Sequence, residues 1–407
     1  MSNGTRVYRV DVDDMKFERH EQSEFFMLKI KTIEIKAKNS ILIKGWVKSI
    51  RRNIMDILTK RQKDILQYTF LLFLIVLTTY LVCTTLNINV LAKIIKIINL
   101  KYIALGFLCI IMYIILEAYI LKIILNSIHK TKLKSLGFNI GTMGLYYNLV
   151  TPLASGSQPM QIYALTKSKV PVSKATAVIA NKTVIFQTVV TLYCGILLFN
   201  HYIYLERELN SIVILVATGM IMNIFALSFG ILIIYSPKKT KKIVNISLNI
   251  LKKIKIFKKL EDKQESINKF IDEYNYSIKL FLNDKKSLIK SLLFTIVQLT
   301  LYFSIAYCIY RSLSLNSQSY GHMLTLQAFL YMAVSPVPTP GNVGANEIAF
   351  FTIFKDVIPK ELLGYSVFLY GIFIYYFILL FCGIFTIRYH YKMKKIRKNE
   401  SSSNINS

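Results

Sequence analysis

Long apolar runs constrain this chain more than any other feature of its sequence. A helix that crosses a bilayer needs about 20 predominantly apolar residues. We predict a full span in each of six stretches: residues 67–86, 100–121, 175–199, 211–235, 287–310 and 362–387. With 54% of its 407 residues hydrophobic, the chain exceeds what a soluble fold of this size buries. The sequence therefore predicts an all-α polytopic membrane protein with about six full spans.

Two further apolar stretches, residues 140–165 and 322–354, are interrupted by Pro, Gly, Ser, Thr and Asn. Proline removes a backbone donor and glycine loosens a helix, so each interruption frees polar groups at a depth where water is absent. We interpret the two stretches as broken re-entrant helical hairpins. With the N-terminus inside, the first enters from the cytoplasm and the second from outside. That arrangement predicts an inverted repeat with a binding site near the midplane.

Basic residues flank the apolar runs, and Lys and Arg outnumber Asp and Glu by 51 to 22. The positive-inside rule then places both termini in the cytoplasm. It equally permits both broken stretches to cross the membrane fully. We expect a cytoplasmic region with an interfacial helix over residues 1–66, a membrane domain over 67–388 with a basic cytoplasmic loop at 237–286, and a basic tail over 389–407. No nucleic-acid-binding motif is visible, and we expect no nucleic acid partner.

The first interruption is rich in hydroxyl and amide side chains that could hydrogen-bond a polar ligand. Its candidate ligand-binding residues are Thr151, Pro152, Ser155, Gly156 and Gln158, with Ser157 and Gln161 beside them. The alternative is a kinked helix whose polar side chains repair their own backbone. The sequence leaves both interpretations open.

The second interruption supplies the candidates Pro340, Gly341, Gly344 and Glu347. A helix that begins near Gly344 would direct free N–H groups and a positive dipole end into the site, which suits a phosphate. Glu347, in the first turn of that helix, is an acidic group at membrane depth and therefore a functional candidate. The alternative for Glu347 is a helix cap with a purely structural role.

Two more charged residues lie within predicted spans. Lys182 either extends to the cytoplasmic surface or reaches the first interruption and holds a phosphate. Glu117 could reach water or pair with Lys122. The cysteines are scattered singly in apolar runs, which indicates packing rather than metal binding: Cys83, Cys109, Cys194, Cys308 and Cys382. Enzyme motifs such as a P-loop or G-x-S-x-G are absent from the sequence, and we expect no metal and no cofactor.

Both interruptions resemble a known family. Thr151 to Gln161 reads TPLASGSQPMQ, and Pro338 to Glu347 reads PTPGNVGANE. Together they resemble the transmembrane-region family of lysylphosphatidylglycerol synthases, over about residues 65–390. The similar membrane domain of the bacterial multiple peptide resistance factor is flippase-like. The resemblance implies a bacterial plasma-membrane protein that translocates aminoacylated phospholipid such as lysylphosphatidylglycerol and contributes to resistance against cationic antimicrobial peptides. Ser157 and Asn342 depart from the family's pattern, which bears on head-group fit.

The sequence and the resemblance support three functional hypotheses. In the first, the chain translocates lipid: Gly344 and Lys182 contact phosphate, Glu347 attracts a cationic head group, and Thr151, Ser155 and Gln158 supply neutral hydrogen bonds. In the second, it is a phosphatidylglycerol lysyltransferase, as the family name implies. We expect the soluble lysyltransferase domain to be absent, because the sequence ends soon after its last span. In the third, it is a scaffold for a separate lipid synthase.

The expected partners are an anionic or aminoacylated phospholipid and the membrane. A separate lipid synthase and a second copy of the chain, in a homo-oligomer, stay open as protein partners.

Overall fold

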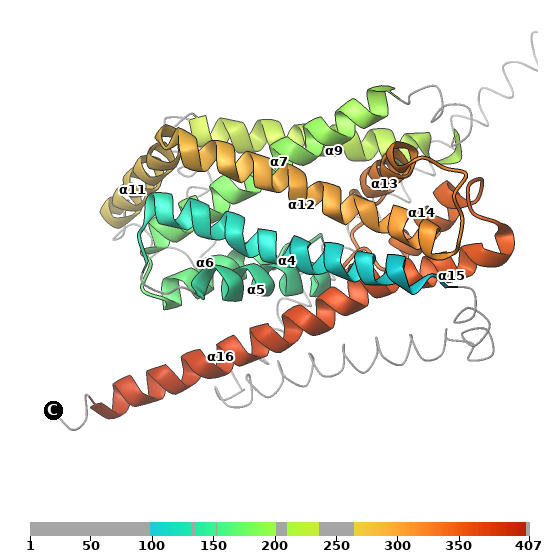
Figure 1. Ribbon diagram of the computed structural model, residues 1–407. Helices are drawn as coiled ribbons and strands as arrows, with labels where there is room; N and C mark the ends of the chain where they lie inside the picture. The colour runs from blue at the N-terminus through green and yellow to red at the C-terminus, as the bar shows by residue number, and fades with distance from the viewer. Residues whose placement is uncertain (1–97, 132–134, 152, 201–209, 236–263, 404–407) are drawn as a thin grey trace, which may run out of the picture. The chain divides into compact units, whose positions relative to one another are not determined.

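Apolar helices make up nearly all of the computed structural model (Figure 1), which describes residues 98–131, 135–151, 153–200, 210–235 and 264–403. These residues belong to one unit that extends from Ala92 to the C-terminus. Several expectations fall outside the described residues: the span over 67–86, the interfacial helix within 1–66, Cys83 and Pro152.

Five of the predicted spans are confirmed as helices long and apolar enough to cross a membrane. Four of them are single helices: α4 (Leu100–Ile128), α7 (Val172–Asn200), α9 (Asn210–Tyr235) and α12 (Lys285–Ser312). The fifth is a continuous run formed by α15 (Lys360–Gly371), the π-helical turn η2 (Ile372–Tyr376) and α16 (Phe377–Ser403). The chain is therefore a polytopic, all-helical membrane protein.

Each interrupted stretch forms two short helices. The first gives α5 (Leu136–Val150) and α6 (Ser157–Lys167), and the second gives α13 (Tyr320–Val334) and α14 (Ala345–Phe354). Leu136 at the start of α5 and Leu165 near the end of α6 share one hydrophobic cluster with Ile128 of α4. The chain therefore returns to the level at which it entered, so α5 and α6 form a hairpin.

The α13–α14 pair also folds back on itself. Gln327 of α13 donates a hydrogen bond to the Tyr370 hydroxyl over 2.6 Å, and the ring of Phe350 in α14 lies 4.7 Å from the same tyrosine ring. Gln327 precedes the break and Phe350 follows it by a similar number of residues. Because Gln327 and Phe350 both contact Tyr370, the chain must reverse its direction between them.

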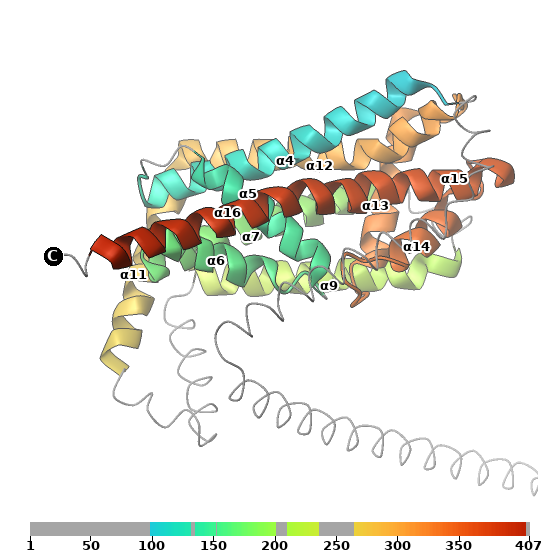
Figure 2. The ribbon, with the colours of Figure 1, turned by 90° about the horizontal axis from the view of Figure 1, so that it is seen from below.

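The long helices α4 and α12 pack against each other in antiparallel orientation (Figure 1). Each is followed along the chain by one of the two hairpins. Tyr113 packs on Tyr302 with ring centroids 5.3 Å apart, and Tyr119 packs on Phe294 at 5.0 Å. Because α5 follows the end of α4 and α13 follows the end of α12, the two hairpins start from opposite ends of this pair. Figure 2 shows α5 and α6 toward the end that carries α11, and α13 and α14 toward the end that carries α15.

The predicted basic loop contains an amphipathic helix, α11 (Gln264–Asn283). Its apolar face buries Ile271, Tyr274, Ile278 and Phe281, while its polar face includes Glu273, which accepts a hydrogen bond from Ser173 Oγ over 2.7 Å. Asp284 then caps α12 by accepting from the Ser287 N–H. Hydrogen bonds from Ser287 hold the pKa of Asp284 below its ordinary value.

Four of the five cysteines lie in the described residues, and all four are free and buried: Cys109, Cys194, Cys308 and Cys382. Their prediction as packing residues is confirmed for these positions.

Candidate functional site

Thr151 organises the first break. Its hydroxyl donates to the Tyr147 carbonyl over 2.6 Å and accepts from the Gly156 N–H over 2.9 Å. Leu153 and Ala154 between them adopt positive φ values of 52° and 55°. A Cβ on Gly156 would lie 2.6 Å from the Thr151 methyl carbon, so a larger residue at this position would clash with Thr151. Thr151 thus hydrogen-bonds to backbone groups of its own break, as expected for a kinked helix whose polar side chains satisfy their own backbone.

The remaining polar residues of the first break divide into two kinds. Gln161 is buried and donates to the Ile140 carbonyl over 3.1 Å, so it fastens α6 to α5. Ser155 and Gln158 are exposed. The amide of Gln158 lies 3.4 Å from the Thr183 hydroxyl of α7, a long contact. Ser155 and Gln158 are consequently the side chains of this break that are accessible to a ligand.

The second break contains a cluster of left-handed backbone conformations. Gly341, Asn342 and Gly344 have φ values of 59°, 55° and 83°, and the chain turns from α13 into α14 through them. The Glu347 carboxylate accepts a hydrogen bond from the Gly344 N–H over 2.6 Å. The predicted helix start is confirmed, and Glu347 does cap it. Pro340 and Gly344 are exposed.

The two breaks meet. A Cβ placed on Gly341 would lie 2.5 Å from a ring carbon of Tyr375 in η2 and 2.9 Å from the Leu149 carbonyl at the end of α5. Both α5 and α13 contain 15 residues, and at about 1.5 Å per residue each reaches roughly 22 Å into the bundle. The contact therefore lies well inside the bundle.

A buried amide on α9 anchors the second break, and sequence reasoning missed it. Asn223 donates to Ser335 Oγ over 3.0 Å and accepts from the Gln187 amide over 2.7 Å. Helix α9 approaches so closely here that a Cβ on Gly219 would overlap the Met332 carbonyl at 1.8 Å. The available signal was an Asn and a Gly four residues apart in a run that is otherwise strongly apolar.

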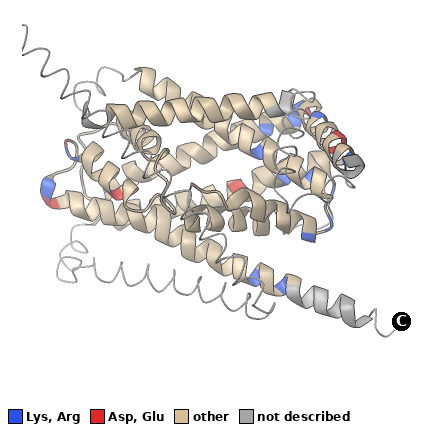
Figure 3. Ribbon diagram, turned by 180° about the vertical axis from the view of Figure 1, so that it is seen from behind, with Lys and Arg blue, Asp and Glu red and all other residues tan. Residues whose placement is uncertain are grey.

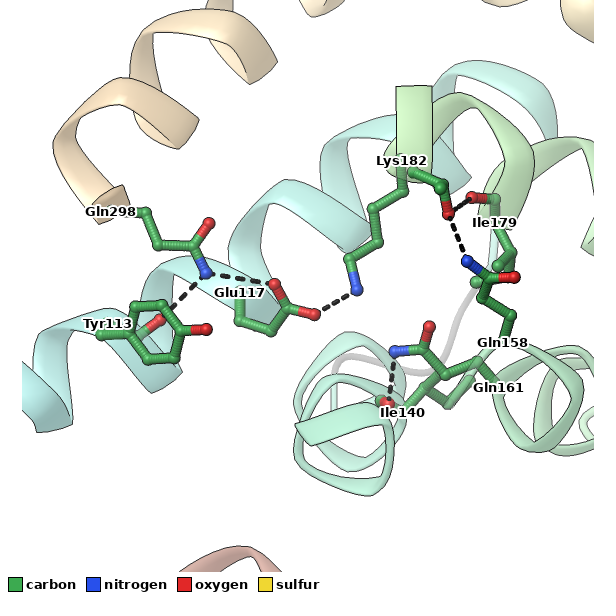
Figure 4. A network of polar contacts seen from close by, with 9 residues as sticks. Tyr113, Glu117, Ile140, Gln158, Gln161, Ile179, Lys182 and Gln298 are labelled. Atoms are coloured by element: carbon green, nitrogen blue, oxygen red, sulfur yellow. Dashed lines mark hydrogen bonds and ion pairs between the residues drawn. The ribbon is translucent and has the colours of Figure 1, made fainter. Parts of the chain in front are cut away.

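An ion pair joins the spans beside the first break (Figure 4), in helices along which charged residues are sparse (Figure 3). The Lys182 ammonium of α7 pairs with the Glu117 carboxylate of α4, and the Gln298 amide of α12 donates to the other Glu117 oxygen over 3.1 Å. Glu117 is 7% exposed. The two alternatives for Glu117, reaching water or pairing with Lys122, were both wrong, because the residue is buried and residues five apart lie about 140° apart around a helix. Gln298 was not predicted.

The structure brings the predicted residues together in two groups. Gln158 contacts Thr183, the residue that follows Lys182 in α7, and Gly341 lies beside the first break through Leu149. Glu347 instead lies on the η2 side, where its carboxylate is 3.9 Å from the position of a Cβ on Gly371. Within the described part of the chain, no three His, Cys, Asp or Glu side chains gather as metal ligands would.

Comparison with known proteins gives one clear relationship. No curated protein and no solved structure matches the chain. The family model described as the lysylphosphatidylglycerol synthase TM region matches residues 65–382, which include both breaks, the Glu117–Lys182 pair and the anchoring Asn223. The chain therefore belongs to the family of lysylphosphatidylglycerol synthase transmembrane regions.

Proposed function

We propose that this chain binds the head group of a phospholipid where its two breaks meet and moves that lipid between the leaflets of a bacterial plasma membrane. The observation that carries the proposal is the contact of Gly341 with Leu149. Two breaks in helical structure, far apart in the chain, are brought to one place inside an apolar bundle. Irregular backbone at such depth is tolerated where it is buried in protein or lines a polar cavity.

The direction of the hairpins supports translocation. We infer that both are re-entrant, so that each returns to the membrane face from which it came, and that they form an inverted repeat. In such repeats the substrate site lies at the interface of the two halves, where each half can open toward one side in turn. The antiparallel packing of α4 on α12 and the opposite origins of the hairpins fit this arrangement.

Each candidate residue then has a role that its environment permits. The exposed start of α14, where Glu347 already takes the Gly344 N–H, offers the positive end of the helix dipole to a phosphate. Ser155 and Gln158 supply neutral hydrogen bonds, and Thr151 holds the backbone that presents them. Glu347 caps α14 and attracts the cationic part of an aminoacylated head group. Pro340 and Gly341 set the shape of the second tip.

We further propose that both termini lie in the cytoplasm, following the distribution of basic residues. A lipid such as lysylphosphatidylglycerol, delivered to the outer leaflet, would then reduce the negative surface charge that attracts cationic antimicrobial peptides.

Reconstitution into liposomes tests this function. Purified protein should equilibrate a fluorescent phosphatidylglycerol or its lysyl derivative between leaflets without any aminoacyl donor, as followed by quenching of the outer leaflet. Glu347→Gln should slow the lysyl lipid more than the unmodified one. Glu361→Gln, a change at an exposed carboxylate in the first turn of α15, is the control.

Lysyl lipid formed by this chain alone from charged tRNA would instead identify a transferase. Absence of both activities, with peptide resistance unchanged by Glu347→Gln in cells, would favour a scaffold.

A further inference from the structure

The Glu117–Lys182 pair takes no part in holding either break together, yet it lies beside the first one. Lys182 is adjacent in sequence to Thr183, the residue that the Gln158 amide contacts across from α6. Gln158 lies in the first turn of α6, whose N-terminus carries the positive end of the helix dipole. The first turn of α6 therefore contacts α7 at the residue next to Lys182, and a lysine ammonium and a helix N-terminus both favour an anion.

The ammonium is already engaged. Its partner Glu117 is fixed by a second contact, the hydrogen bond from Gln298 of α12, while Lys182 has a long flexible stem and a side chain that is 14% exposed. Figure 4 shows the lysine extended from α7 toward Glu117, with Gln158 and Gln161 on its other side. A phosphate that enters at Gln158 would thus approach the more mobile member of the pair.

Charge neutrality limits how this pair can respond to a bound phosphate. With Lys182 on Glu117 the pair is neutral. If a phosphate monoanion takes the ammonium, the carboxylate is left with the Gln298 amide alone, and an uncompensated charge in such an environment is costly. Protonation of the carboxylate restores neutrality: a lysinium with a phosphate, and a carboxylic acid that can still accept from Gln298.

Within the described part of the chain, the other side chains that interact with Glu117 are neutral. Tyr113 of α4 and Cys382 of α16 interact with it electrostatically, and a phenol and a thiol are both neutral at pH 7. Helix α12 contributes the Gln298 amide and Tyr302, which packs on Tyr113. The described part of α5 has Tyr146 and Tyr147 as its titratable residues. Lys182 is the cation that pairs with Glu117.

We propose that Lys182 exchanges partners, leaving Glu117 for the phosphate of a lipid head group, and that Glu117 takes up one proton from the aqueous phase in the same step. The new bond is the carboxylic O–H, and the proton returns to water when the phosphate leaves and the ion pair re-forms. Head-group binding is thereby linked to proton uptake. This inference rests on the proposed lipid site and deepens it, because it supplies a means by which pH could act on transport.

Binding measurements on the purified full chain test the exchange directly. Fluorescent phosphatidylglycerol should bind with uptake of about one proton, detected by an indicator dye in weakly buffered solution. Over the pH range in which binding takes up this proton, affinity should fall about tenfold for each unit rise in pH. Glu117→Gln, which is permanently neutral, should bind at least as tightly as the unmodified protein, without proton uptake and without this pH dependence.

Two further variants keep the result interpretable if Glu117→Gln folds poorly. Lys182→Met should lose most binding at every pH, and Glu361→Gln should retain both the affinity and the proton uptake of the unmodified chain. Inorganic phosphate is tested in parallel: if it alone binds with uptake of one proton, the exchange stands with free phosphate as its ligand.

Lipid affinity that stays flat with pH in the unmodified chain, or pH dependence that persists in Glu117→Gln, would overturn the exchange. Neither result would remove the proposed translocation, which the liposome assay tests separately. Conversely, proton-linked lipid binding by a chain that moves no lipid would remove the translocation and leave the exchange.

Discussion

Two breaks interrupt helical hydrogen bonding inside the bundle, one between α5 and α6 and one between α13 and α14. Different parts of the chain hold the two breaks in place. The first is closed locally by the Thr151 hydroxyl, which bonds to Tyr147 and Gly156. The second also has local bonds, at Gly344 and at the Gly341 carbonyl. It is in addition held from a distance, by Asn223 of α9 acting on Ser335 and by Tyr375 packed against Gly341. The first tip is therefore a self-contained unit, whereas the conformation of the second depends on its neighbours.

This difference has a consequence for transport. A self-contained tip can move as a rigid body with α6, while a tip held by α9 and η2 must respond to any shift of those helices. The π turn adds to this dependence, since such turns are frequent at functional sites and are places of local irregularity in a helix. The second break is thus the one at which movement of α9 or the last span would be transmitted to a bound lipid.

The largest expected effect comes from filling the contact between the breaks. Gly341→Ala places a methyl group 2.5 Å from Tyr375 and 2.9 Å from the Leu149 carbonyl, at a φ of 59°. Strain and overpacking together should cost about 2–4 kcal/mol, seen as a lower unfolding temperature in detergent and loss of lipid movement in liposomes.

Gly344→Ala is the matched control for that substitution. Its φ of 83° with a ψ of −49° is at least as unfavourable for alanine, but nothing lies within 4 Å of the added Cβ. It should cost only the backbone strain, about 1–3 kcal/mol. Equal losses for the two variants would show that the contact between the breaks contributes nothing beyond backbone conformation.

A smaller effect should result from releasing the second break from α9. Asn223→Leu removes the hydrogen bond to Ser335 and the side-chain oxygen that accepts from Gln187, whose amide keeps only the backbone carbonyl of α9 as its acceptor there. Polar contacts between membrane helices contribute about 0.6–1.7 kcal/mol, so we expect a destabilisation of roughly that size. Protease or thiol-labelling accessibility near Ser335 should rise, while accessibility near Ser155 should not.

Ser228→Ala serves as the control on the same helix, since Ser228 is exposed and donates to the Ile224 carbonyl of its own helix. If Asn223→Leu loosened both breaks alike, the second break would not be separately dependent on α9, and the contrast between the two breaks would be lost.

The sequence was sufficient for the elements that depend on apolar length. Runs of about 20 residues predicted α4, α7, α9, α12 and the last span, and the Pro and Gly clusters located both breaks. The helix start at Gly344 with Glu347 in its first turn also came from local rules, because a turn that needs positive φ and a capping carboxylate are both visible within four residues.

What the sequence could not supply was pairing between distant helices. Lys122 and Lys182 were both available to Glu117, and only the packing of α7 on α4 selects Lys182. The same holds for Gln298, Asn223 and Gln187, whose amides look like isolated polar residues in apolar runs until three helices come together. The π turn was missed for a different reason: its i→i+5 bonding leaves no mark on an apolar pattern as dense as Ile372–Tyr376.

The smallest effect tests the self-contained character of the first break. Thr151→Val keeps the shape of the side chain but removes the acceptor for the Gly156 N–H and the donor to Tyr147. By analogy with the loss of a helix-capping hydroxyl, the cost should be about 1 kcal/mol. Thr352→Val, which alters a half-buried threonine that donates to Ile348 within its own helix, should cost less. Because the first break is closed by its own residues, Thr151→Val should raise labelling near Ser155 and leave the environment of Ser335 unchanged. Labelling that rises at Ser335 as well would mean that the two tips share one unit of stability, and that the lipid site opens and closes as a whole.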